Sequence, residues 1–120
     1  MAKSKMKALA VPVIRKRLGE LHGWTLSRGA LRCEFVFEGF KQALQFVNRV
    51  GALAEAADHH PDIDIRYSRV RLALSTHDAG GITEKDFALA AAIVSAAALI
   101  DLDEGVRLMS NLVKDEEGYP

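Results

Sequence analysis

The residues best suited to chemistry lie between Glu55 and Asp86, where three of the four histidines of the chain occur. His59 and His60 stand together before a proline, and His77 follows after a strand–turn–strand pattern. Imidazole and carboxylate groups transfer protons and bind metal ions in many enzymes. We therefore interpret this segment as the frame of an active site and the rest of the chain as its support.

A hairpin between the histidines is predicted to bring them to one edge of a sheet. If the chain turns midway between them, His59 and His60 align with His77 across an antiparallel ladder. Asp86, one turn into the next helix, then points back over the same end, and Glu55 comes from the last turn of the preceding helix. Because successive side chains of a strand point to opposite faces, strand geometry at His59 and His60 would send the two rings in different directions.

Each of these residues also has an ordinary structural interpretation, and these alternatives stay open. His59 and His60 could complement the C-terminal end of a helix. His77 could be a surface residue at a strand end, Asp86 a helix-capping residue, and Tyr67 a core aromatic whose hydroxyl reaches water. Their convergence on one sheet edge favours the functional interpretation.

A metal site is the rival chemical hypothesis, because histidine and carboxylate commonly bind zinc or non-haem iron. The sequence has no H-x-x-x-H or H-x-H pair that a helix or strand would aim at one point. Adjacent histidines are a poor chelate. We therefore expect no metal ligands among these residues.

Hydrophobic periodicity predicts three helices and four strands in the order α-β-β-α-β-β-α. Apolar residues recur at three- and four-residue steps in the predicted helices and at alternate positions in the strands, as in Leu31, Cys33 and Phe35. The spacing Thr83-x-x-Asp86 indicates a capping box at the start of the last helix. The predicted helices cover residues 12–21, 39–57 and 84–99, the predicted strands cover 24–26, 30–37, 63–67 and 70–76, the last two strands are joined at 68–69, and residues 101–114 form a further turn or two of helix.

This order predicts an α+β fold, in which a four-stranded antiparallel sheet carries three helices on one face. The other face is expected to be solvated or to lie against another subunit, because it carries the polar residues Arg32, Glu34, Arg71 and Ser75. Alanines surround the last helix, which permits close helix approach and makes self-association plausible.

Composition indicates one domain with a single core. The chain has 120 residues, of which 49% are hydrophobic. Its 16 basic and 16 acidic residues balance, which argues against a nucleic-acid partner.

Cys33 is the single cysteine, so we expect a small core residue without a disulfide, in a reducing, cytoplasmic setting. The N-terminal segment lacks a signal cleavage site and the longest apolar run is too short to span a bilayer, so no membrane partner is expected.

The spacing of the candidate residues resembles the signature of the pterin-4a-carbinolamine dehydratase family. The matching positions are Glu55, His59-His60-Pro61, Tyr67, His77 and Asp86. The gaps that separate them are three, five, nine and eight residues long. Further matches are Gly23-Trp24, Phe35-x-Phe37, and Leu74-Ser75-Thr76-His77-Asp78 leading to Gly81-Ile82-Thr83. The resemblance covers about residues 9–98, and residues 99–120 form an extension of the same single domain. One departure is Ile63, at a position where many members have an aromatic residue.

The resemblance implies a four-stranded sheet with three helices on one face, no cofactor, no metal, and assembly as a homodimer or homotetramer. It implies dehydration of 4a-hydroxytetrahydropterin to quinonoid dihydropterin and water, in the recycling of tetrahydrobiopterin-type pterins. The C4a hydroxyl is a poor leaving group unless it is protonated, and a nearby ring N–H must lose its proton. Histidine, with an unperturbed pKa of about 6.5, suits both tasks.

From this resemblance we predict that three histidines are catalytic, namely His59, His60 and His77. His59 is the expected acid at the departing hydroxyl, with His77 on the opposite side of the ring. His60 and Asp86 are expected to orient the pterin or its partners, and Glu55 to hold a histidine in its working tautomer. The other predicted substrate-orienting residues are Asp58, Thr76 and Asp78.

Two other functions stay open at this point. Members of the family can also stabilise oligomers of a transcription factor, and the exposed sheet face would then be the docking surface. A protein that binds pterin without turnover is a further alternative.

Overall fold

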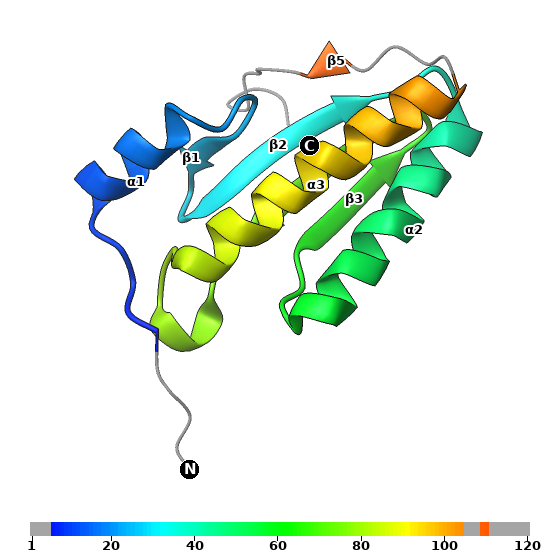
Figure 1. Cartoon of the computed structure of the whole chain (residues 1–120). Coiled ribbons are helices and arrows are strands. Elements are labelled where there is room, and N and C mark those ends of the chain that lie inside the picture. The colour runs from blue at the N-terminus through cyan, green and yellow to red at the C-terminus, as the bar shows by residue number, and fades with distance from the viewer. Residues whose placement is uncertain (1–5, 105–108, 111–120) are drawn as a thin grey trace.

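The computed structural model describes residues 6–104 and 109–110, which form one antiparallel sheet with helices packed against it. The helices are α1 (Val11–Leu18), α2 (Phe40–Ala57) and α3 (Glu84–Glu104), together with a short 3-10 helix, η1 (His77–Ala79). The strands are β1 (Thr25–Ser27), β2 (Ala30–Val36), β3 (Asp62–Arg66), β4 (Arg69–Leu74) and β5 (Met109–Ser110). Figure 1 shows α2 and α3 side by side across one face of the sheet. The predicted α+β class and element order are confirmed.

The strand order in the sheet is β1-β2-β4-β3, and all of these neighbours are antiparallel. Leu31 lies opposite Leu74, and Cys33 lies opposite Leu72. Since side chains alternate between the two faces of a strand, this register places the predicted apolar positions together on the face that the helices cover.

Aromatic side chains from the sheet and from α2 form the centre of the core. Phe46 is fully buried, and its ring centroid lies 4.7 Å from that of Phe35 and 5.1 Å from that of Phe37. Trp24 packs edge-on against Phe35, with 6.3 Å between ring centroids. Burying one large apolar side chain stabilises a fold by about 1.5–3 kcal/mol, so these contacts fix α2 firmly on the sheet.

The opposite face of the sheet is less solvated than predicted. Glu34 is buried, because Arg69 donates a hydrogen bond to its carboxylate at 2.9 Å and Arg71 donates another at 3.2 Å. The two guanidinium groups neutralise the carboxylate in charge-assisted hydrogen bonds. Arg32 and Ser75, also predicted on this face, are half-buried.

The connection between β3 and β4 differs from the prediction in its position. Tyr67 and Ser68 form a two-residue turn, and Arg66 pairs with Arg69 across it. Tyr67 has a φ of 51°, the left-handed conformation that such tight hairpins require. The predicted strand over 63–67 therefore ends one residue earlier, at Arg66, and the alternative of a core tyrosine is wrong. Tyr67 is 70% exposed, and its ring stacks on Phe40 with 6.5 Å between centroids.

The first and last helices also differ from the predicted bounds. α1 ends at Leu18, before residue 21, and a succession of turns leads to β1. α3 continues to Glu104, because the sequence offers no glycine or proline after its start until Gly105. Of the further helix predicted over 101–114, residues 101–104 are helical as the end of α3, whereas Met109–Ser110 forms β5 beside β2; residues 105–108 and 111–114 lie outside the described residues. No helix within the described residues is long and apolar enough to cross a membrane.

Candidate active site

A buried hydrogen-bonded chain joins three of the predicted site residues. His59 Nε2 lies 2.6 Å from Asp86 Oδ1, and Thr76 donates its hydroxyl proton to Asp86 Oδ2 at 2.7 Å. The Asp86 side chain is completely buried, and the His59 side chain is 10% exposed. The three residues come from the end of α2, the start of α3 and the loop after β4. The fold therefore places one nearly buried imidazole against a fully buried carboxylate.

The end of α2 determines which histidine points inward. Asp58 follows the helix in the left-handed conformation, with φ 54° and ψ 44°. The backbone N–H of His59 donates to the carbonyl of Ala54 at 3.1 Å, which closes the last turn of the helix. Pro61 then holds the chain extended at the start of β3. As a result His59 is buried while His60 is exposed.

Asp86 is positioned by the first turn of α3. The backbone N–H of Thr83 donates to Asp86 Oδ2 at 2.9 Å, and the backbone N–H of Lys85 donates to Thr83 Oγ1 at 3.2 Å. The first bond is that of the predicted capping box, and in the second the N-cap hydroxyl accepts from the N2 residue Lys85 instead of from Asp86. The positive end of the helix dipole further stabilises a carboxylate at this position. Asp86 is thus both a helix cap and the partner of His59.

The loop between β4 and α3 brings Thr76 and Thr83 together. Thr76 and Gly81 form an isolated antiparallel bridge, in which the N–H of Thr76 donates to the carbonyl of Gly81 at 2.8 Å. Gly80 closes the loop with a φ of 72°, which a residue with a side chain rarely adopts. The hydroxyl oxygens of Thr76 and Thr83 lie 2.8 Å apart, and Thr83 is fully buried.

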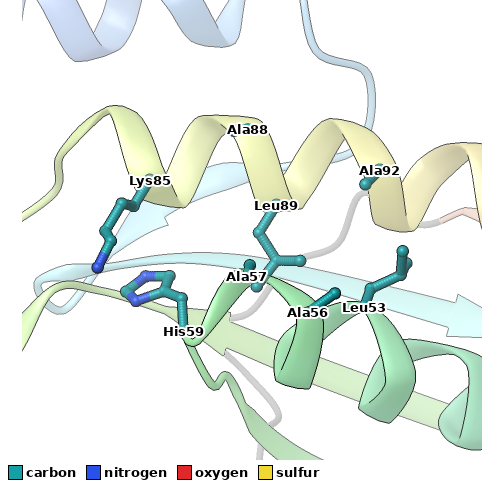
Figure 2. A pocket seen from close by; sticks show the side chains of 8 residues that line it. All are labelled: Leu53, Ala56, Ala57, His59, Lys85, Ala88, Leu89 and Ala92. Atoms are coloured by element: carbon teal, nitrogen blue, oxygen red, sulfur yellow. The ribbon is translucent and has the colours of Figure 1, made fainter.

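An apolar hollow of about 360 Å³ opens beside His59, between the last turns of α2 and the first turns of α3. Figure 2 shows His59 at one end of this hollow and the Lys85 side chain reaching from α3 toward the imidazole. The hollow is lined by Leu53, Ala56, Ala57, His59, Lys85, Ala88, Leu89 and Ala92. Its volume is within the range of small-molecule sites, which are mostly apolar with a few polar groups.

The second predicted histidine forms a separate, exposed pair. His60 Nε2 lies 2.6 Å from Glu55 Oε2, and the two side chains are 56% and 79% exposed. The structure thus joins Glu55 to His60, and Asp86 to His59. Both imidazoles therefore have a carboxylate partner, one buried and one in water.

The remaining predicted residues are not joined to this network. His77 begins η1 and is exposed, and within the described residues its side chain forms no hydrogen bond or ion pair. Asp58 and Asp78 are also exposed. Of the residues predicted to orient a substrate, Asp86 contacts both Thr76 and His59. The sequence predicts Thr83 only as a helix cap. Its capping-box spacing to Asp86 is the sequence feature that could have indicated its position beside the site.

The buried carboxylate defines how His59 can exchange protons. An ionised carboxylate only accepts hydrogen bonds, so Nε2 of His59 is protonated and donates a hydrogen bond to Asp86. A proton can then be released or accepted at Nδ1. Within the described part of the chain, no group of three or more histidine, cysteine, aspartate or glutamate side chains could hold a metal ion. The arrangement is suited to proton transfer by one oriented imidazole.

Comparison with known proteins identifies relatives of the chain. Residues 7–96 match the family described as pterin 4 alpha carbinolamine dehydratase. A relative from Chloroflexus aurantiacus, named provisionally as a pterin-4-alpha-carbinolamine dehydratase, is 56% identical over 88 residues, which are 73% of this chain and 95% of the relative. A relative from Acidobacterium capsulatum with the same provisional name is 53% identical over 88 residues, which are 73% of this chain and 96% of the relative.

Two solved structures have a similar fold. A protein of Brucella melitensis described as a transcriptional coactivator/pterin dehydratase has a TM-score of 0.74 and 31% identity, with 76% of this chain and 99% of that chain covered. A pterin dehydratase-like protein described as a RuBisCO assembly factor of the alpha-carboxysome has a TM-score of 0.55 and 28% identity, with 63% and 90% covered.

Proposed function

The chain belongs to the pterin-4-alpha-carbinolamine dehydratase family, and from this premise we propose that it dehydrates 4a-hydroxytetrahydropterins to quinonoid dihydropterins. The observation that supports this proposal most directly is the buried 2.6 Å contact between His59 and Asp86 beside an apolar hollow. A hollow of about 360 Å³ suits a flat bicyclic ring in volume. The expected substrate is therefore a small pterin, without a cofactor.

His59 is the proposed general acid. In its imidazolium form, with Nε2–H still bonded to Asp86, His59 donates its Nδ1 proton to the C4a hydroxyl as the C–O bond breaks; water leaves, and His59 becomes the neutral Nε2–H tautomer. The electron pair of the neighbouring ring N–H bond forms the new C=N bond, and the released proton passes to a second base. Protons balance over the cycle, because the second base releases one proton to solvent and His59 takes one up. Such acid–base assistance contributes roughly 10²–10⁴-fold.

The exposed imidazoles are the proposed proton acceptors. His77 is proposed to act from the opposite side of the pterin ring, and His60 to contact the substrate near its edge. Glu55 holds His60 in one orientation by accepting a hydrogen bond from Nε2. Both histidines are open to solvent, which lets them return protons to water between turnovers.

Stopped-flow decay of a 4a-carbinolamine, with and without protein, tests the proposal directly. His59→Ala should lower the enzymatic rate by roughly 10²-fold or more. His22→Ala is the matched control, because His22 is an exposed histidine outside this site. Equal decay with and without wild-type protein would contradict the proposal. Exhaustive chelation before the assay tests whether the activity depends on a metal.

A non-catalytic interaction protein is the second candidate, and two structural relatives favour it. One structural relative is described as a coactivator and the other as an assembly factor. On this alternative the sheet face around Arg69 and Arg71 would dock a partner protein. A pull-down that recovers a protein partner in stoichiometric amount, together with no acceleration of carbinolamine decay, would favour this function over catalysis.

A further inference from the structure

The hydrogen bonds behind His59 lead one residue further, to Thr83. Thr83 is fully buried, and its hydroxyl oxygen lies 2.8 Å from that of Thr76, which in turn contacts Asp86. We propose that Thr83 is a positioning residue, which acts through Thr76 and Asp86 to hold His59 in one tautomer and one orientation. The placement follows from geometry, and its effect on turnover rests on the proposed function.

The direction of each hydrogen bond in this relay follows from its acceptors. The Asp86 carboxylate only accepts, so Thr76 donates its single hydroxyl proton to Oδ2. The oxygen of Thr76 can then only accept from Thr83, whose hydroxyl must therefore donate. The oxygen of Thr83 accepts from the backbone N–H of Lys85 at 3.2 Å. Both hydroxyl groups are thus oriented, with no proton left to rotate.

This relay determines which carboxylate oxygen faces the imidazole. Oδ2 of Asp86 accepts from Thr76 at 2.7 Å and from the backbone N–H of Thr83 at 2.9 Å, which leaves Oδ1 for His59. Rotation of the carboxylate would break both bonds to Oδ2 in a site closed to water. Hydrogen bonds in such chains polarise and strengthen one another, so the Thr83 hydroxyl supports the last bond, to Nε2 of His59.

An ordinary helix cap would not need the Thr83 proton. Capping uses the oxygen of Thr83 as an acceptor and its backbone N–H as a donor. The hydroxyl proton has a use only in the bond to Thr76, which lies outside α3. Thr76→Val therefore breaks the relay and leaves the cap intact, whereas Thr83→Val removes the relay and the cap bond from Lys85. Thr83→Ser keeps both.

The experiment measures the His59 imidazole by ¹⁵N–¹H NMR in the full-length protein, with the resonance assigned by its loss in His59→Gln. Wild type and Thr83→Ser should show the single Nε2–H tautomer, whereas Thr83→Val and Thr76→Val should show a mixture of tautomers. In the dehydratase assay, each valine variant should lower kcat by about tenfold at unchanged KM, a part of the roughly 10²–10⁴-fold that acid–base catalysis supplies. Because the two hydroxyls act in series, the double variant should be no slower than the slower single variant.

Folded Thr83→Val with a wild-type imidazole spectrum and wild-type kcat would overturn the proposal, as would multiplicative losses in the double variant. If Thr83→Val fails to fold, Thr76→Val tests the proposal by the same imidazole spectrum and the same kcat, because this variant keeps the helix cap. A changed His59 spectrum in a protein whose wild type does not dehydrate the carbinolamine would overturn the proposed function and support the positioning role.

Discussion

His59 Nε2 lies 2.6 Å from Asp86 Oδ1, across a separation of 27 residues in the sequence. This contact joins the end of α2 to the start of α3, and each helix end places its residue by its own terminal hydrogen bonds. The geometry of the imidazole therefore depends on how two helices terminate, and it does not require a mobile loop. Variants of the buried carboxylate should accordingly affect chemistry and stability together.

Asp86→Asn should lower dehydratase turnover by roughly 10²-fold or more, because an amide cannot accept from Thr76, Thr83 and His59 at once. The unpaired buried groups should also cost about 1–3 kcal/mol in the free energy of unfolding. Stopped-flow kinetics and urea denaturation measure the two effects. Glu38→Gln, at an exposed carboxylate, should change neither. Wild-type kinetics in folded Asp86→Asn would contradict the role of the carboxylate.

The capping box and the fold could be predicted from the sequence because both depend on short-range patterns. Alternation in β2 identified the buried positions Leu31, Cys33 and Phe35, and the spacing of Thr83 and Asp86 identified the start of α3. The same spacing also placed Asp86 near the histidines. These features follow from local geometry with periods of two and of about three and a half residues.

Which of the two adjacent histidines is buried could not be predicted from spacing. It depends on Asp58, which takes a left-handed conformation that aspartate adopts only in some helix ends. Tyr67 similarly occupies a positive-φ turn position usually held by asparagine or glycine, so its sequence pattern indicated a strand instead. In both cases tertiary packing selects a backbone conformation that local propensity does not favour.

The exposed pair of Glu55 and His60 should contribute little to stability. Exposed ion pairs stabilise proteins by about 0–1 kcal/mol, so Glu55→Gln should shift the free energy of unfolding by less than about 1 kcal/mol. If Glu55 acts by holding His60, its loss should lower turnover in wild type and have no additional effect in His60→Ala. A double-mutant cycle in the carbinolamine assay measures this coupling. Independent, multiplicative losses would show that Glu55 acts on another group.

Cys33 should resist alkylation in the folded protein. Burial raises the pKa of its thiol well above the usual range, with the Glu34 carboxylate a smaller contribution in the same direction. Because the thiolate is the reactive form, iodoacetamide at pH 8.5 should modify the native protein far more slowly than the protein in denaturant. Mass spectrometry over time measures both rates, and Cys33→Ser should take up no label. Rapid native labelling would show that the strand opens locally.

The contact between α1 and the start of α3 should weaken at acid pH. Arg17 donates a hydrogen bond to Glu84 at 2.8 Å and lies over the Phe87 ring at 4.5 Å. The hydrogen bond from Arg17 lowers the pKa of the Glu84 carboxyl in the folded protein. The stabilisation from this hydrogen bond is therefore fully present above the unfolded pKa of Glu84, and it is lost as the pH falls through the lower, folded pKa. The Tm difference between wild type and Glu84→Gln should thus be largest near neutral pH, begin to fall near the ordinary pKa of glutamate, about 4.3, and vanish only below the lower, folded pKa. Thermal denaturation across that pH range measures the difference, with Glu38→Gln as the control. A difference that grew on acidification would contradict the assigned direction.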